Sequence, residues 1–181
     1  MDTIQSKRLI LKQPTFDNVA HFFEWHVPDD DADLHLSIEI LTREEIRKRI
    51  QTNYYWSATN RYYIIYLRST NKPIGFIHYW YNATESHLCN IGIRIADRNE
   101  RNRGLGTEAQ SALIDVLFAH TSVRAIEMYT DVDNRPQQSC LAKLRFDFIE
   151  AVQFHDLDKC RVGRRYRLHK TAWLKHHGVT Q

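Results

Sequence analysis

The chain has 181 residues, of which 43% are hydrophobic and 26% are charged, and its formal net charge is +3. This length and composition predict one soluble globular domain over residues 1–181. The longest obvious apolar run, residues 62–67, is far shorter than the ~20 residues that span a bilayer, and the N-terminus has no apolar signal core, so no membrane partner is expected. So small a net charge does not by itself imply nucleic acid, and no nucleic-acid partner is expected.

The first predicted elements are a strand and a helix. Residues 7–13 alternate as a strand does, and Pro14 ends the pattern. Thr15 is expected to cap a helix that runs to about Trp25. The apolar face of this helix is predicted to consist of Phe16, Val19, Ala20 and Phe23.

A second helix follows an acidic loop at residues 28–33. Thr42 and Glu45 fit a capping box, in which each residue satisfies a backbone N–H of the other. Leu41 and Ile46 fit a hydrophobic staple at the same helix start. The sequence therefore predicts a helix from Thr42 to about Tyr54.

A three-stranded meander comes next. The predicted strands cover residues 62–68, 74–81 and 87–96, and the turns between them cover residues 69–73 and 82–86. In the third strand, one face is expected to carry Cys89, Ile91, Ile93 and Ile95. The opposite face is expected to carry Leu88, Asn90, Gly92 and Arg94.

The stretch after the third strand predicts a phosphate-binding turn. Gly104 and Gly106 precede an amphipathic helix over residues 107–120, and Arg101 and Arg103 add positive charge. The first N–H groups of a helix lack intrahelical partners and attract anions, although such a turn is also often a simple loop. No Walker lysine and no third glycine are present, which argues against an ATPase and against a dinucleotide enzyme.

The C-terminal part is predicted to add a strand, a helix and a strand pair. The strand covers residues 124–130, and Pro136 suits the first turn of a helix that carries Leu141. Residues 146–155 and 160–171 look like a closing antiparallel pair, and His176 and His177 look like a solvated tail. The element order is β-α-α-β-β-β-α-β-α-β-β, which predicts an α+β fold with one mostly antiparallel central sheet flanked by helices.

The motif R-x-x-G-x-G at Arg101–Gly106 resembles the acyl-CoA pyrophosphate loop of the GNAT superfamily of N-acetyltransferases, and the element order resembles the GNAT fold. Within that superfamily the chain looks most like the ribosomal-protein N-terminal acetyltransferase (RimJ/RimL-like) branch. Three stretches carry this closer resemblance: residues 6–11, residues 104–109 with Phe118, and residues 133–146. Arg145 stands where the family usually has glycine.

The resemblance implies an enzyme that transfers an acetyl group from acetyl-CoA to a primary amine by direct attack in a ternary complex. It implies that the backbone of Ile93, Arg94 and Ile95 pairs with the pantetheine arm. It places the loop residues Arg101, Asn102, Arg103, Gly104, Leu105, Gly106 and Thr107, together with Asn134 and Lys143, around the cofactor. Asn134 also fits a plain helix N-cap.

Proton transfer is the part of the chemistry that the resemblance leaves open. Some family members have a glutamate base at the position of Asn90, and others have a tyrosine acid at the position of Leu141. Candidate substitutes on or beside the neighbouring predicted strands are His78, Glu85 and His87. The catalytic candidates are therefore Asn90, His78 and Glu85. Ser139 or Cys140 is a candidate proton donor to the departing sulfur, although Cys140 also fits a small packed side chain.

The expected acceptor is a small cationic amine or a protein N-terminus. The aspartates of residues 28–33 would attract such a cation, unless they form a solvated loop. The alternative function is a non-catalytic acyl-CoA-binding sensor or assembly module, and a further rival is nucleic-acid binding through the basic run 159–170. Three widely spaced cysteines predict reduced thiols in a cytoplasmic protein with no metal site. A homodimer is expected only by analogy with the family.

Overall fold

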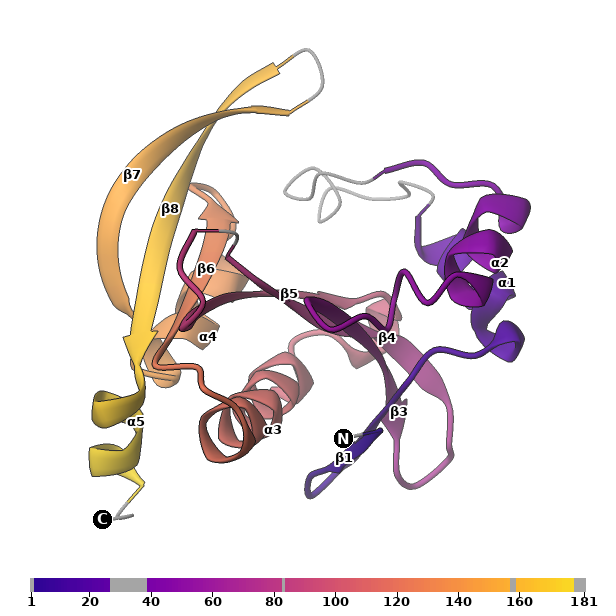
Figure 1. Cartoon of the computed structure of the whole chain (residues 1–181), viewed down its shortest axis with the longest axis horizontal. Helices are drawn as coiled ribbons and strands as arrows, with labels where there is room; N and C mark the ends of the chain where they lie inside the picture. Colours follow the sequence, from indigo (N-terminus) through magenta and orange to yellow (C-terminus); the bar gives the residue numbers. More distant parts are fainter. Residues whose placement is uncertain (1, 27–38, 83, 157–158, 178–181) are drawn as a thin grey trace.

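The computed structural model describes residues 2–26, 39–82, 84–156 and 159–177 (Figure 1). These residues form one eight-stranded sheet in the order β1-β2-β3-β4-β5-β6-β8-β7. Every neighbouring pair is antiparallel except β5–β6, which is parallel. This confirms the predicted α+β class. The acidic loop expected at residues 28–33 lies outside the described residues.

Two hydrophobic clusters cover the two faces of the sheet. The larger one packs α3, α4 and α5 against the sheet and includes Leu113, Leu141 and Trp173. The smaller one packs α1 and α2 against the other face through Phe22 and Ile46. Figure 1 shows the resulting three-layer arrangement, with α1 and α2 on one side of the sheet and α3 on the other.

The N-terminal hairpin was only half predicted. Strand β1 (Thr3–Gln5) pairs with β2 (Leu9–Lys12), and only β2 was expected. The predicted helix after Pro14 divides into a 3-10 turn η1 (Phe16–Asn18) and helix α1 (Val19–Trp25). The 3-10 turn changes the helical phase, so Phe22 is fully buried and Phe16, which was expected on the apolar face, is 59% exposed.

Helix α2 (Arg43–Gln51) begins as the sequence predicts. Thr42 Oγ1 accepts the Glu45 N–H at 3.2 Å, and Glu45 Oε2 accepts the Thr42 N–H at 2.7 Å, which confirms the capping box. The helix ends before Tyr54 because Asn53 takes a left-handed conformation with φ 56°.

The meander consists of β3 (Asn60–Leu67), β4 (Pro73–Tyr81) and β5 (Leu88–Ile95). A short 3-10 turn η3 (Arg98–Glu100) then leads to α3 (Leu105–His120). Helix α3 buries Leu113, Ile114, Leu117 and Phe118.

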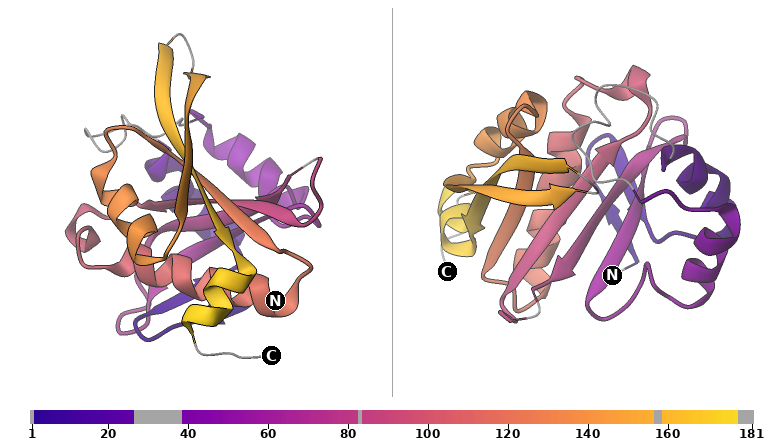
Figure 2. Two further views of the ribbon diagram at one scale, coloured as in Figure 1. Left: turned by 90° about the vertical axis from the view of Figure 1, so that its left-hand side faces the viewer. Right: turned by 90° about the horizontal axis from the view of Figure 1, so that it is seen from above.

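The remaining elements are β6 (Ala125–Asp131), α4 (Arg135–Lys143), β7 (Asp147–Asp156), β8 (Lys159–His169) and α5 (Lys170–His176). Strand β8 pairs with β6 only from Gly163 onward, so the far part of the β7–β8 ribbon projects from the sheet, as Figure 2 shows.

The predicted strand over residues 160–171 ends at His169, because residues 170–176 form helix α5; His176 and His177 at the end of this helix are exposed, as the sequence predicted. Helix α5 buries Trp173, whose Nε1–H donates to Asp115 Oδ1 of α3 at 2.9 Å. None of the helices within the described ranges is both long enough and apolar enough to cross a membrane.

Candidate active site

The parallel strands β5 and β6 stay paired over only three residue pairs. The register runs from Leu88↔Ala125 to Asn90↔Glu127, after which β6 continues along β8. Among the described residues, no strand pairs with this edge of β5 from Ile91 to Ile95. Backbone groups along this edge are therefore available to a ligand, as a sheet edge is to an added strand.

The glycine loop places the first turn of α3 beside this edge. Asn102 and Gly104 both adopt left-handed conformations, with φ 59° and φ 74°, and Gly104 is the N-cap of α3. Left-handed φ is inexpensive for glycine, which has no Cβ. The first N–H groups of this 16-residue helix have no partner within the helix, and they point into the loop together with the positive end of the helix dipole.

The two loop arginines are held by protein partners. Arg101 Nε donates to the Ile95 carbonyl at 2.9 Å and its Nη2 donates to the Ala96 carbonyl at 3.2 Å. Arg103 pairs with Glu100 at 2.5 Å. Arg101 thus fixes the loop to the end of β5, a role that the sequence analysis did not foresee.

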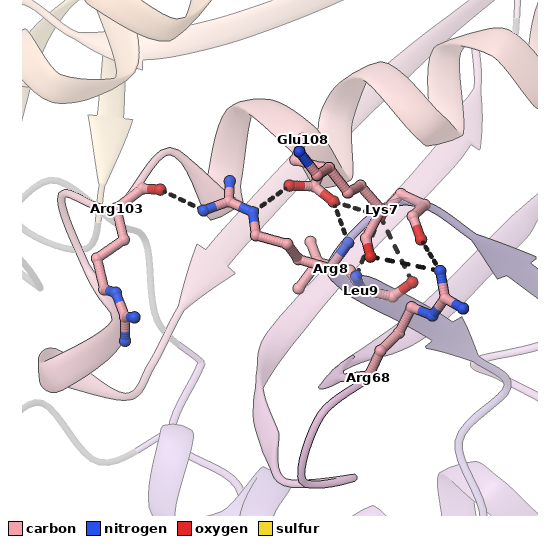
Figure 3. A network of polar contacts seen from close by, with 7 residues as sticks. Lys7, Arg8, Leu9, Arg68, Arg103 and Glu108 are labelled. Atoms are coloured by element: carbon pink, nitrogen blue, oxygen red, sulfur yellow. Dashed lines mark hydrogen bonds and ion pairs between the residues drawn. The ribbon is translucent and has the colours of Figure 1, made fainter.

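A polar network ties the glycine loop to the β1–β2 turn (Figure 3). Glu108 accepts hydrogen bonds from Ser6 Oγ at 2.8 Å, from the Arg8 N–H at 2.6 Å and from Arg8 Nε at 2.6 Å. Arg8 Nη1 in turn donates to the Arg103 carbonyl at 2.9 Å. Burial alone would raise the pKa of Glu108, but these donors hold it below its usual value.

A cleft of about 580 Å³ opens between the loop, β5 and α4, and we call it the α3–α4 cleft. It brings together Ile93, Arg94, Ile95, Arg101, Asn102, Gly104, Leu105, Gly106, Thr107, Asn134 and Lys143. Arg103 is not among its lining residues, since its side chain turns to Glu100. The expected cofactor residues other than Arg103 therefore share one cavity.

Helix α4 forms the wall of the cleft opposite α3. Asn134 caps α4 by accepting the Gln137 N–H at 3.1 Å, so its N-cap role is present and its amide also faces the cleft. Thr107 Oγ1 donates to Cys140 Sγ at 3.1 Å and so connects the two helices. Gln137 also lines the cleft, which the sequence analysis did not predict. Its position about one helical turn after Asn134 is the one feature of the sequence that indicates it.

A second, smaller cavity of about 220 Å³ lies against the same strand, and we call it the aromatic cavity. Its rings belong to His26, Tyr54, Tyr55, Tyr62, Phe76 and His78. An ion pair between Arg49 and Glu39 and residues Gly92, Ile93 and Arg94 complete its lining. It shares Ile93 and Arg94 with the α3–α4 cleft, so the two cavities meet at β5.

His78 lies over β5 inside the aromatic cavity. A Cβ on Gly92 would sit 2.2 Å from His78 Nε2, so glycine at this position makes room for the ring. The His78 ring packs against Tyr62 at a tilt of 31°, with a centroid distance of 4.2 Å. Burial lowers the pKa of His78 to about 3, which keeps the imidazole neutral at physiological pH.

The model of the acetyltransferase (GNAT) domain family matches residues 8–147 of the sequence. The chain belongs to the GNAT acetyltransferase family. None of the curated proteins compared with it matches in sequence.

Solved structures of GNAT acetyltransferases share this fold at low sequence identity. RimL, the ribosomal L7/L12 alpha-N-protein acetyltransferase in complex with coenzyme A, has a TM-score of 0.82 at 16% identity, covering 94% of this chain and 99% of RimL. A GNAT acetyltransferase from Bacillus anthracis has a TM-score of 0.77 at 19% identity, with coverages of 93% and 99%. The aminoglycoside acetyltransferase AAC(6')-Ib in complex with coenzyme A has a TM-score of 0.78 at 18% identity, with the same coverages.

The family resemblance places Asn90 and Leu141 at the positions of the proton-transfer groups. Both are buried, Leu141 completely, and neither lines the α3–α4 cleft or the aromatic cavity. Asn90 stands in register with Glu127, a 2% exposed carboxylate that sequence reasoning missed. Arg167 Nε and Nη2 donate to Glu127 at 2.8 and 2.6 Å and neutralise it.

The structure does not bring Glu85 to the site. Glu85 is exposed on the turn before β5, and the glycine loop follows the opposite end of that strand. His87 contacts the Ser122 carbonyl through Nδ1 at 3.0 Å and also lies at the distant end. Of the three catalytic candidates, only His78 lines a cavity beside the free edge of β5.

Proposed function

We propose that this GNAT acetyltransferase transfers an acetyl group from acetyl-CoA to a primary amine by direct attack in a ternary complex. The observation that carries the proposal is the convergence, in one cleft, of the free edge of β5 and the N-terminus of α3. GNAT acetyltransferases take their acetyl group from acetyl-CoA as an activated thioester, and the neighbouring structures of RimL and AAC(6')-Ib hold coenzyme A.

The residues of the α3–α4 cleft fit coenzyme A. The N–H groups of the loop from Asn102 to Gly106 suit the diphosphate, because a helix N-terminus favours negative charge. The backbone of Ile93 and the N–H of Ile95 on the unpaired edge of β5 suit the amide-bearing pantetheine arm, whereas the Ile95 carbonyl already accepts from Arg101. The volume of about 580 Å³ lies within the ~300–1,000 Å³ of ordinary ligand pockets.

The chain's own contribution to the chemistry is orientation and electrostatic stabilisation. Fixed backbone donors along β5 would stabilise negative charge that develops on the acetyl carbonyl; one such donor is worth roughly 3 kcal/mol where measured. Holding amine and thioester together contributes several kcal/mol more, of the ~7–11 kcal/mol available to ideal orientation. With its lowered pKa, His78 is too weak a base to deprotonate an ammonium ion, so the acceptor reacts as the free amine. The amine nitrogen bonds to the thioester carbon, the C–S bond breaks, and the proton that the nitrogen loses goes to the departing thiolate.

Release of free thiol from acetyl-CoA tests the proposal with three acceptors: a small arylalkylamine, a polyamine and a peptide with a free N-terminus. We expect turnover that requires both protein and amine. The variant with bulky residues at both Gly104 and Gly106 should lose coenzyme A binding and turnover while keeping its circular-dichroism spectrum.

The alternative is a non-catalytic acyl-CoA-binding module, which Asn90 and Leu141 favour because neither transfers protons. Tight coenzyme A binding without turnover of any amine in the same assay would select it. Nucleic-acid binding through β8 has less support, since Arg167 pairs with Glu127 and Arg165 pairs with Glu150 at 2.8 Å. The homodimer and the cytoplasmic location stay predictions.

A further inference from the structure

The aromatic cavity has the position that an acceptor site requires. It is lined by Ile93 and Arg94, which also line the α3–α4 cleft, so a group in this cavity lies next to the free edge of β5. The reacting atoms of a ternary complex must come within about 3–3.5 Å of each other.

The size and lining of the cavity favour a compact, flat occupant. Its volume of about 220 Å³ is below the ~300–1,000 Å³ of pockets for drug-sized ligands. Ring centroids of Tyr62 lie 4.8 Å from Tyr55 and 5.9 Å from Phe76, and such spacings match the ~4.5–7 Å at which aromatic rings pack. A guest ring would meet faces and edges of the same kind.

The polar groups of the cavity disfavour a polycation. The carboxylate of Glu39 is bound in a bidentate manner, with Arg49 Nη1 and Nη2 at 2.8 and 2.5 Å. Among the described lining residues Glu39 is the one carboxylate, and Arg49 already neutralises it, so it offers little attraction to a polycation. Burial lowers the pKa of both His26 and His78, so neither ring supplies charge at neutral pH.

The same environment favours the reactive form of an amine. Burial in this cavity would lower the pKa of an amine, because it disfavours the ammonium ion. Two buried polar groups line the cavity: His78 Nδ1, which accepts no hydrogen bond from the described residues, and the Tyr55 hydroxyl, which has the Arg49 guanidinium nearby. Tyr55 is 3% exposed, and these two groups can orient a neutral amine without supplying charge.

We propose that the aromatic cavity is the acceptor site and that it takes a primary amine on a short chain attached to an uncharged aromatic ring, an arylalkylamine. This rests on the proposed acetyl transfer and names its substrate class. It differs from the cationic acceptor that the acidic residues 28–33 suggested. The ring packs among Tyr55, Tyr62 and Phe76, and the amine points toward Ile93.

Conjugates that join an amine to the sulfur of coenzyme A through an acetyl spacer test the site without depending on turnover. Calorimetry compares the 2-phenylethylamine conjugate, the spermidine conjugate and coenzyme A itself. We expect the phenylethylamine conjugate to bind at least about tenfold tighter than either of the others, from ring packing and ring burial together.

Variants that lack a cavity ring show whether the tighter binding of the phenylethylamine conjugate comes from the aromatic cavity. Tyr62→Leu should reduce the phenylethylamine advantage to less than about threefold and leave the Kd of coenzyme A unchanged, since the leucine keeps apolar contact but loses ring packing. Tyr54→Leu, at a 48% exposed position in the lining, repeats the test with little risk to folding. Phe148→Leu, a 55% exposed ring outside the cavity, is the control and should change nothing.

Equal or tighter binding of the spermidine conjugate would overturn the inference, and so would a phenylethylamine advantage that survives both tyrosine substitutions. Either result leaves the proposed acetyl transfer intact. Failure of coenzyme A itself to bind would instead refute the proposed function together with the inference.

Discussion

Replacing Glu108 by glutamine tests whether the β1–β2 turn positions the glycine loop. Glu108 is the one carboxylate in the network of Figure 3, and it accepts from Ser6 and from both the backbone and the side chain of Arg8. Arg8 then holds the Arg103 carbonyl, which belongs to the loop itself. Glutamine keeps the size of the side chain but removes the charge and replaces one acceptor by a donor.

The exposure of the Arg8 and Glu108 side chains determines how much free energy of unfolding Glu108→Gln should lose. A hydrogen bond to a charged group contributes roughly 1.5–3 kcal/mol, but the Arg8 side chain is 45% exposed and an exposed ion pair is worth only about 0–1 kcal/mol. The Glu108 side chain is 17% exposed, so the Arg8 N–H and the Ser6 hydroxyl account for most of the effect. We expect a loss of about 1.5 kcal/mol, or about 3–6 °C in Tm for a chain of this size.

Thermal unfolding and calorimetric titration with coenzyme A measure the two effects of Glu108→Gln. If the network positions the loop, the Kd should rise by about tenfold, which corresponds to ~1.4 kcal/mol. Asp115→Asn removes a carboxylate from the same helix without touching the loop and should leave the Kd unchanged. A Glu108→Gln protein with the Kd of the native chain would refute the positioning role, even if its Tm falls.

Three further substitutions test the conformation of the glycine loop, the burial of His78 and the N-cap of α4. Gly104→Ala should cost about 1–2 kcal/mol in urea unfolding because φ is 74°, whereas Gly106→Ala, whose Cβ would lie 3.7 Å from Ile95, should fold normally. Because the pKa of His78 is about 3 in the folded chain and near 6.5 in the unfolded chain, the stabilising contribution of the neutral imidazole is present above pH 6.5 and is lost as the pH falls toward 3. The free energy of unfolding should therefore fall by up to ~1.4 kcal/mol per pH unit below 6.5, and urea titrations should show a flatter dependence for His78→Gln. Asn134→Ala should cost about 1 kcal/mol through the lost cap of α4, and an additional rise in the Kd of coenzyme A would show a direct contact.

Local chemistry explains what the sequence predicted correctly. The capping box of Thr42 and Glu45 spans four residues, and the alternation of β5 needs no partner to be recognised. The glycine loop was predicted from its position between a strand and a helix, and Gly104 does adopt a left-handed conformation as the N-cap. Each of these signals lies within one element and its flanks.

Long-range contacts explain what the sequence could not predict. Strand β1 has a single buried residue, Ile4, so its alternation is too short to recognise. Helix α5 docks through the hydrogen bond from Trp173 to Asp115, and Asp115 lies 58 positions earlier in the sequence. Arg101 looked like a phosphate ligand because nothing in the motif shows that its guanidinium reaches the Ile95 carbonyl. The cavity rings of His26, Tyr62 and His78 come from separate elements, so only the tertiary structure assembles them.

Titration calorimetry of coenzyme A into the purified protein shows whether the glycine loop and the free edge of β5 form one cofactor cleft. We predict a saturable heat with one coenzyme A per chain, which is lost when Gly104 and Gly106 both carry bulky side chains. No heat at millimolar coenzyme A, where a binding free energy of only about −4 kcal/mol would be detected, would contradict it.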